Sequence, residues 1–572
     1  MHHHRFNIIC SYTFVPIVQN SFMLRIIIAV FLSVILLPGI SFSQKLKKAD
    51  KAIIASLQLH VGYLADDKLE GRRAGTNGEK LAMEYIAGQF EKAGLSPKGD
   101  NNTWYQAFDI NDGKEINPAT YLLINGGEIK SPGFFPFIGS PNKAIEAAPS
   151  IALREAGMPW FLNLKEELEN NKNNPHFDVQ EYVLAQVKDA AKKNATAFIV
   201  YNTGDAADDF TFDGKEKALP LPVPVIYIQK DIAKKYFTDE SATVEIKLKT
   251  VFTEKKRIGH NVVGYIDNGA PTTIITGAHF DHLGYGEDGG SLYTGKEKLI
   301  HNGADDNASG TAALIELSKL LKTSKLKSNN YLFIAFSGEE LGLLGSKYYT
   351  EHPTIDLSKA NYMINMDMVG RLNDSSKTVT IGGYGTSPAW GGLFTAISTD
   401  QNFINRYDSS GIGPSDHSSF YLKAIPVLFF FTGVHSDYHK PTDDADKINY
   451  TGEYRIVKYI YKIIEATNNK GRLVFSKTRD TQSVGGVKLN VTMGIMPDYA
   501  FSGNGVRADA VSDGRPAQKA GLKPGDVIIQ LGDYPVLSVE NYMQVLNKFK
   551  KGDKTKVKIK RSNEIIEADV QF

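Results

Sequence analysis

The stretch from Thr272 to His282, which reads TTIITGAHFDH, decides the fold. Its first half is a run of β-branched residues typical of a buried strand, and two histidines and an aspartate follow at once. Other strand-like runs alternate with helical stretches, notably Ala308–Leu321. These runs are Asn261–Ile266, Tyr331–Phe336, Tyr362–Met366 and Ile425–Phe431. The alternation predicts an α/β fold with a mostly parallel central sheet flanked by helices.

Acidic residues and histidines gather near the ends of these elements. They form five clusters: His279 to His282, Asp305 with Asp306, Glu339 with Glu340, Asp367, and the pair His435 and His439. Taken alone, the aspartate pair is typical of a helix N-cap, the glutamate pair of a solvated turn, and a single histidine after a strand of a hydrogen-bonded structural residue. Ligands of open α/β sheets, however, bind outside the carboxyl ends of the strands. Converging carboxylates repel one another unless cations neutralise them, so the set predicts a metal site.

The metal that suits this set of residues is zinc. The chain has one cysteine, Cys10, so histidines and carboxylates must supply the ligands. Two histidines with three or four carboxylates suit two Zn²⁺ ions in a catalytic site. Two such ions need a bridging carboxylate, and one further carboxylate must stay unligated to move protons. The pair Glu339 and Glu340 can divide ligation and proton transfer between them.

Five motifs follow one another along the chain: AHFDH at 278–282, GADDNASG at 303–310, FSGEE at 336–340, NMDMVG at 365–370 and YHKPTD at 438–443. In sequence and in order they resemble the motifs of the secreted co-catalytic di-zinc aminopeptidases. The resemblance covers about residues 53–108 and 261–466, and it includes LEGRRAG at 69–75. It implies an enzyme that hydrolyses the N-terminal peptide bond of peptides or proteins.

The resemblance also implies the ligands of two zinc ions. His279 and Asp367 are expected to hold one zinc, Glu340 and His439 the other, and Asp306 to bridge the two.

Three further residues receive catalytic roles from the resemblance. Glu339 is expected to be the general base and acid, and Asp281 to orient His279. Tyr438 matches a tyrosine that steadies the tetrahedral oxyanion. The resemblance implies, in addition, a cis peptide bond between Asp306 and Asn307.

A region of different character interrupts the predicted sheet at about Ile116–Thr250. It contains an alanine-rich helical stretch, then the strand-like runs TAFIVY at 196–201 and VPVIYI at 223–228. These features indicate a small α/β or β-rich insert that resembles a protease-associated domain. An elaborated lid is the alternative, and both interpretations imply gating of substrate access.

The C-terminal region resembles bacterial PDZ domains. The resemblance lies in RPAQKAGLKPGDVIIQL at 515–531, which implies a β-sandwich or barrel-like domain. Gly494 and Ile495 match the loop that receives the carboxylate of a C-terminal peptide ligand. A PDZ domain without a ligand is the alternative.

The length of 572 residues predicts three or four domains. We expect residues 1–43 to be a signal peptide with a superfluous N-terminal extension. The catalytic domain is expected to be discontinuous, with residues 44–115 and 255–467, and the insert to span residues 116–254. Residues 468–483 would form a linker and residues 484–572 the PDZ domain.

The N-terminal region predicts export. An apolar segment, Arg25–Leu37, follows a positive charge and precedes the small-x-small pattern Ser41-Phe42-Ser43. This is typical of a signal peptide cleaved near Ser43, and Met23 would be its natural start. The segment is too short for a comfortable transmembrane helix, so we expect a secreted or periplasmic protein without stable membrane insertion. An uncleaved anchor is the alternative.

Composition and site chemistry limit the other classes of function. A net charge of +1 gives no basic field that would attract nucleic acid. Another exopeptidase of the same clan remains an alternative, as does a glutaminyl cyclase, which resembles this scaffold but uses a single zinc. A non-catalytic peptide-binding module is the alternative of a different class. The complete ligand set argues against the cyclase, and Glu339 together with that set argues against the module.

Overall fold

The computed structural model describes residues 46–174, 177–208, 210–215, 218–397, 404–478, 491–497, 501, 503–511, 514–562 and 564–572. The chain divides into two compact units, residues 1–52 and 53–572, and helix α2 (Lys48–Leu64) starts in the first of them. The predicted signal peptide and the predicted boundary at residue 484 lie outside the described residues. None of the helices within the described ranges is long and apolar enough to cross a bilayer.

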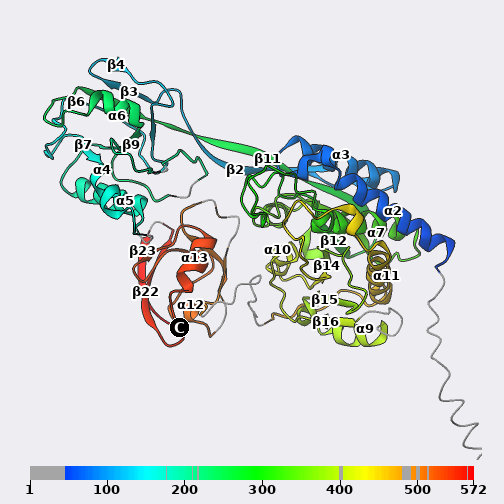
Figure 1. Ribbon diagram of the computed structural model, residues 1–572. Helices are drawn as coiled ribbons and strands as arrows, with labels where there is room; N and C mark the ends of the chain where they lie inside the picture. The colour runs from blue at the N-terminus through cyan, green and yellow to red at the C-terminus, as the bar shows by residue number, and fades with distance from the viewer. Residues whose placement is uncertain are drawn as a thin grey trace, which may run out of the picture. The chain divides into compact units, whose positions relative to one another are not determined.

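A nine-stranded sheet forms the main part of the second unit (Figure 1). Its order is β1-β11-β13-β12-β14-β17-β15-β16, and β2 pairs with β11. The central strands β13, β12, β14 and β17 are parallel, whereas β11 and β15 pair antiparallel with their neighbours toward the centre. The bounds are β1 Ser96–Pro97, β2 Tyr105–Ile116, β11 Phe252–Ile266, β12 Thr273–His279, β13 Asn330–Phe336, β14 Ala360–Met366, β15 Thr378–Gly382, β16 Ile404–Tyr407 and β17 Val427–Phe431.

Helices cover this sheet, because every residue of β12, β13 and β14 is buried. Helix α7 packs on these three strands and touches α3 and α11, while α8 and α10 contact each other and strands β2, β11, β14 and β17. The bounds are α3 Asn77–Lys92, α7 Gly310–Thr323, α8 Leu344–Glu351, α9 Ala389–Ile397, α10 His417–Tyr421 and α11 Tyr450–Thr467. The α/β architecture predicted from the sequence is confirmed.

The register of the central strands brings their carboxyl ends to one edge. His279, the last residue of β12, pairs with Phe336, the last residue of β13. Met366 at the end of β14 pairs with Phe430 of β17. Segments that follow these strands therefore start side by side, which is the arrangement that the predicted metal site requires.

Two four-stranded sheets occupy the region between β2 and β11. One has the order β4-β3-β10-β6, and the other, β5-β9-β8-β7, contains both strand-like runs predicted from the sequence. The bounds are β3 Tyr121–Ile124, β4 Gly127–Glu128, β5 Phe134–Pro136, β6 Lys143–Ala147, β7 Trp160–Asn163, α4 Lys165–Asn171, α5 Val179–Lys192, β8 Phe198–Tyr201, β9 Val225–Ile228, α6 Lys230–Tyr236 and β10 Ile246–Thr250.

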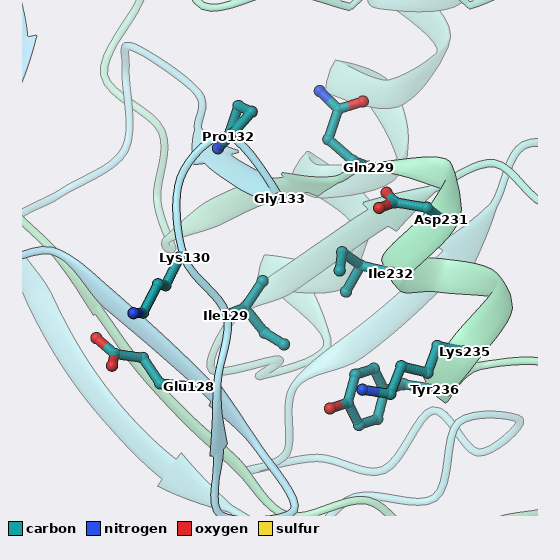
Figure 2. A pocket seen from close by; sticks show the side chains of 10 residues that line it. All are labelled: Glu128, Ile129, Lys130, Pro132, Gly133, Gln229, Asp231, Ile232, Lys235 and Tyr236. Carbon is teal, nitrogen blue, oxygen red and sulfur yellow. The ribbon is translucent and has the colours of Figure 1, made fainter.

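This region also contains a cavity of about 650 Å³ (Figure 2). Ile129 and Pro132 line one side, and Ile232 and Tyr236 of α6 line the other. None of the residues predicted to bind metal or substrate lines this cavity.

The C-terminal region is a sheet with the order β18-β19-β20-β22-β23, in which neighbours are antiparallel and β21 pairs with β20. Gly494, which precedes β18, has a φ of +76°, and a Cβ there would overlap the side chain of Arg515. The bounds are β18 Ile495–Pro497, β19 Val506–Val511, α12 Pro516–Lys519, β20 Val527–Leu531, β21 Tyr534–Pro535, α13 Val539–Leu546, β22 Lys554–Arg561 and β23 Glu564–Gln571.

Candidate metal centre

The segments after the central strands bring the predicted ligands together. His279 ends β12, Asp367 follows β14 directly, and Glu340 lies four residues beyond the end of β13. Asp306 lies in a π-helical turn, Ala304–Ser309, immediately before α7. His439 follows β17 in a long loop and has a φ of +54°.

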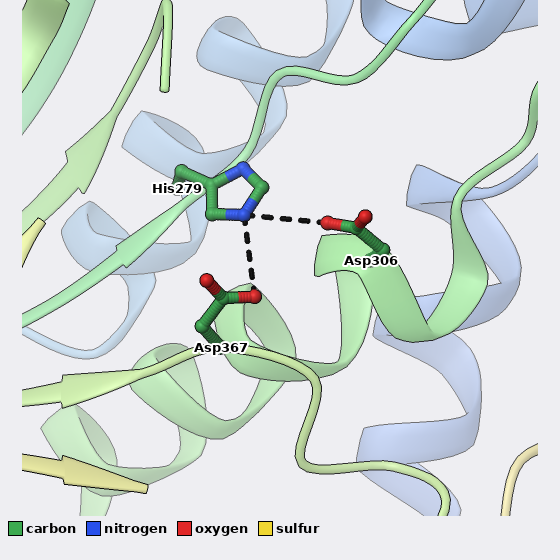
Figure 3. A group of neighbouring side chains, drawn as sticks. All are labelled: His279, Asp306 and Asp367. Atoms are coloured by element: carbon green, nitrogen blue, oxygen red, sulfur yellow. Dashed lines mark ion pairs between the residues drawn. The ribbon is translucent and has the colours of Figure 1, made fainter. Parts of the chain in front are cut away.

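The first cluster contains His279, Asp306 and Asp367 (Figure 3). His279 Nε2 lies 3.4 Å from Asp306 Oδ1 and 3.4 Å from Asp367 Oδ1. One imidazole nitrogen therefore faces two carboxylate oxygens, an arrangement in which three donors converge on one point.

The second cluster uses the other oxygen of Asp306. His439 Nε2 lies 3.2 Å from Asp306 Oδ2 and 3.2 Å from Glu340 Oε2. Asp306 therefore faces both clusters, one with each oxygen. The structure thus brings all five predicted ligands together, with Asp306 between the two pairs.

His282, which is not among the predicted ligands, also belongs to the second cluster. Its Nδ1 lies 2.7 Å from Glu340 Oε1 and 3.9 Å from Asp306 Oδ2, and its side chain is fully buried. His282, Asp306 and Glu340 have potential ligand atoms within 4.8 Å of one another. The AHFDH motif contains the sequence feature that could have identified His282, because this second histidine lies only three residues after the end of β12. His439 Nε2 lies 3.2 Å from each of the two carboxylates, whereas His282 Nδ1 is close only to Glu340, and this equal approach favours His439 as the ligand.

Hydrogen-bond partners orient both histidines of the predicted ligand set. His279 Nδ1 lies 3.2 Å from the backbone oxygen of Asp281 and 3.7 Å from its Oδ1. The same Asp281 Oδ1 accepts a hydrogen bond of 3.1 Å from the backbone N–H of Glu339. His439 Nδ1 lies 2.8 Å from the carbonyl oxygen of Gly290. In both histidines Nδ1 faces a backbone oxygen, so Nε2 is the nitrogen that faces the carboxylates.

The pKa values of the cluster residues are shifted because histidines and carboxylates lie close together. Burial lowers the pKa of His279, but Glu339 and Asp367 outweigh it and hold that pKa well above its usual value. Burial likewise opposes ionisation of Asp306, yet the surrounding histidines, His282 first, bring its pKa well below the usual range. The pKa of His439 rises to about 11 because Glu340 and Asp306 outweigh its burial.

The residues fit a divalent metal. Their donors are imidazole nitrogens and carboxylate oxygens only, which is a set suited to zinc. A metal ion binds imidazole and carboxylate in their deprotonated forms, so its binding would release protons from this site. His282 Nε2 and Asp281 Oδ2 are buried without a hydrogen-bond partner among the described residues, so polar capacity remains around the clusters.

Glu339 and Tyr438 lie at the edge of the clusters. Glu339 Oε2 is 4.0 Å from His279 Nε2, farther than either aspartate of the first cluster. Burial raises the pKa of Glu339, and Asp367 and Glu340 raise it further. Tyr438 stacks on His439 with ring centroids 3.9 Å apart. Burial and the nearby anions hold the pKa of Tyr438 far above its usual value, so its hydroxyl keeps its proton.

Two residues without a predicted site role fix the turn that carries Asp306. Asn307 Oδ1 accepts hydrogen bonds from the N–H groups of Gly310 and Met368, at 2.9 and 3.1 Å. Asp443 Oδ2 accepts from the N–H groups of Asp305 and Asp306, at 3.0 and 3.1 Å. The expected cis bond between Asp306 and Asn307 is present.

We expect His417 to make stability fall in mild acid. Its ring is buried and stacks on Phe429 with centroids 4.5 Å apart, and burial lowers its pKa to about 3. The unfolded chain takes up a proton below about pH 6.5, whereas the folded chain does not until about pH 3. The free energy of unfolding should therefore fall by about 2 kcal/mol from about pH 7 to about pH 5 through this group.

Urea denaturation at both pH values checks this expectation. His417→Phe keeps an aromatic ring but cannot titrate. The decrease in the free energy of unfolding between the two pH values should therefore be smaller in this variant. An equal pH dependence in the two proteins would contradict the assignment.

Two family models match the chain. Residues 261–464 match peptidase family M28, and residues 480–572 match the PDZ domain. The first of these spans contains all five predicted ligands.

Known proteins are also similar to the chain. Aminopeptidase YwaD of Bacillus subtilis is 28% identical over 46% of this chain and 55% of its own length. The probable lipoprotein aminopeptidase LpqL of Mycobacterium tuberculosis is 26% identical over 69% of this chain and 81% of its own length. The chain spans about half the length of several curated relatives that it matches.

One solved structure that is similar to the chain is an aminopeptidase from Aneurinibacillus sp. strain AM-1. It is 22% identical, and the match covers 74% of this chain and 95% of that one with a TM-score of 0.40. The family matches and the two clusters lie on the same residues. Residues 261–464 of this chain therefore match peptidase family M28, and residues 480–572 match the PDZ domain.

Proposed function

We propose that this protein is a zinc-dependent aminopeptidase that removes the N-terminal residue from peptides. The observation that carries the proposal is that two clusters share Asp306, while Glu339 lies beside the first cluster at a longer distance from His279. The family match supports it, as do relatives whose names describe aminopeptidases.

The two clusters would each hold one zinc ion. His279 and Asp367 are the ligands of one zinc, Glu340 and His439 those of the other, and Asp306 is shared. When bound, the ions lower the pKa of the attacking water and polarise the scissile carbonyl.

Glu339 is the general base and acid in this proposal. Because it lies beside the ligands, it can accept the proton of the attacking water and pass it to the leaving amine. Its raised pKa suits the second task, since a protonated carboxyl must persist until the amine departs. Asp281 positions both His279 and Glu339. Its Oδ1 lies 3.7 Å from His279 Nδ1 and accepts a hydrogen bond from the backbone N–H of Glu339.

Tyr438 is suited to stabilise the tetrahedral oxyanion. Its hydroxyl stays protonated at neutral pH, and stacking on His439 keeps the ring beside the second cluster. A neutral hydroxyl donor at this place gains strength as negative charge develops on the carbonyl oxygen.

The proposal extends to the other regions of the chain. We take residues 44–115 with 255–467 as the catalytic domain and 116–254 as an insert that gates substrate access. Residues 484–572 would bind a C-terminal peptide at Gly494 and Ile495. Export with cleavage near Ser43 is part of the same proposal, supported by the apolar segment Arg25–Leu37.

Hydrolysis of aminoacyl-p-nitroanilides by the full chain tests the proposal. We expect release of the coloured amine, loss of release with a chelator and recovery with zinc. N-acetylated substrates should remain intact, because an aminopeptidase requires a free α-amino group. Cyclisation of N-terminal glutamine without hydrolysis would instead establish the cyclase alternative, and cleavage of blocked substrates would exclude an aminopeptidase.

A further inference from the structure

A glycine-rich loop, residues 284–301, reaches His439 from the other side of the site. The carbonyl oxygen of Gly290 lies 2.8 Å from His439 Nδ1, and the backbone N–H of Leu292 donates to the backbone oxygen of His439 at 2.9 Å. The loop thus determines both where His439 lies and which of its ring nitrogens faces the carboxylates.

The side-chain contacts next to Gly290 are mainly polar, and one of them joins Ser291 Oγ to His301 Nε2 at 2.7 Å. Gly286, Gly289 and Gly290 all have φ values between 80° and 84°, a region that glycine enters at low cost. A Cβ at Gly289 would have no heavy atom within 4 Å, and Leu292 is 55% exposed. The position of Gly290 therefore depends on polar tethers rather than on packing.

Asp288 is such a tether, two residues before Gly290. Arg73 grips it with two hydrogen bonds, from Nε to Oδ2 at 2.6 Å and from Nη2 to Oδ1 at 2.7 Å. Arg257 Nη2 adds a third, at 3.0 Å to Oδ2. The side chains of Arg73, Arg257 and Asp288 are 14%, 10% and 15% exposed. An arginine–carboxylate pair with two hydrogen bonds and little solvent exposure holds its two side chains in place far better than an exposed ion pair does.

The two arginines come from segments outside the loop. Arg73 is the fifth residue of the LEGRRAG motif at 69–75, and Arg257 lies in β11. Lys215 adds a contact of 2.6 Å to Asp288 Oδ1 and donates to the backbone oxygen of Glu287 at 3.0 Å. The loop is thus held at Asp288 by cations from three separate parts of the sequence.

Asp112 of β2 is a matched control. It faces the same arginines, with 3.0 Å to Arg257 Nε and 3.3 Å to Arg73 Nη2, and its side chain is 13% exposed. It lies outside the loop, so its loss changes the same charge cluster without releasing Gly290.

We propose that Asp288 is a positioning residue for the second metal cluster: gripped by Arg73 and Arg257, it places the Gly290 carbonyl that orients His439. The inference rests on the proposed function, because it assumes that His439 is a zinc ligand. It assigns to LEGRRAG the task of holding the metal site through Arg73.

Zinc release from the loaded full-length chain to a chromogenic chelator tests the inference. We expect two zinc ions per chain in the unaltered protein. In Asp288→Ala, the affinity for one of them should fall by about 10- to 100-fold, the range seen when a partner of a metal-bound histidine is lost. The affinity for the other zinc should be unchanged, and Asp112→Asn should retain both. Asp288→Asn, which preserves volume, should show the same selective loss if Asp288→Ala does not fold.

The outcomes separate the inference from the proposed function. Unchanged affinity for both ions in Asp288→Ala would overturn the inference, and so would equal losses at both sites or an equal loss in Asp112→Asn. Unfolding of both Asp288 variants would also overturn it, because it would mark a general structural residue. Selective zinc loss in a protein that hydrolyses no aminoacyl substrate would support the inference and refute the aminopeptidase. An unaltered chain that binds fewer than two zinc ions would refute both.

Discussion

Replacing Glu339 with glutamine is expected to lower kcat by about 10²- to 10⁴-fold while both zinc ions stay bound. The amide is nearly isosteric with the carboxylate but cannot accept a proton from the attacking water. Zinc should remain because His279 Nε2 lies closer to Asp306 and Asp367 than to Glu339. Steady-state kinetics on an aminoacyl-p-nitroanilide and elemental analysis after dialysis measure the two effects.

Glu340→Gln is the matched control for this experiment. Glu340 is the neighbouring residue of the same motif, and its Oε2 lies 3.2 Å from His439 Nε2. Its replacement should therefore weaken zinc binding at the second cluster, with activity falling as zinc is lost. If Glu339→Gln lost zinc and Glu340→Gln kept it, the roles assigned to the two glutamates would be reversed.

Replacing Asp306 with asparagine is expected to remove both zinc ions. Asp306 Oδ1 faces His279 and Oδ2 faces His439, so one substitution affects both clusters. Loss of an outer partner alone costs about 10- to 100-fold in metal affinity, and loss of a shared ligand should cost more at each site. Chelator competition and elemental analysis measure this loss, and activity should fall to background with it.

Asp367→Asn tests whether the effect is specific to the shared ligand. Asp367 lies 3.4 Å from His279 Nε2 and belongs only to the first cluster. One zinc should therefore be lost and the other retained. Retention of both ions in Asp306→Asn, or loss of both in Asp367→Asn, would contradict the assignment of Asp306 as the bridge.

The central strands could be predicted from the sequence because their residues are local signals. β12, β13 and β14 are continuous runs of apolar and β-branched residues, and such runs fit strands buried on both faces. The five proposed ligands were selected from the sequence for a related reason. Each follows the end of a strand or precedes a helix, and the family resemblance supplied their pairing.

The sequence indicated helix and strand boundaries less well where the backbone conformation depends on residues far away in the chain. Ala308–Leu321 was predicted as a helix, but α7 starts at Gly310 after a π-helical turn. That turn is held by Asp443, which accepts from two of its backbone N–H groups, and by Asn307, which accepts from the N–H of Met368 after β14. The insert showed two strand-like runs in the sequence, whereas the structure builds two separate sheets there from short strands. Strands of two to five residues are too brief for a clear periodic pattern.

The α/β class, the buried strands and the residue types at the candidate metal site follow from the amino-acid sequence, because burial and ligand chemistry act residue by residue. The contact of His282 with Glu340 and the meeting of Arg73 and Arg257 at Asp288 arise from the tertiary structure. These contacts join residues separated by 31 to 215 positions. Strand order and loop paths set their distances, and no local pattern in the sequence encodes them.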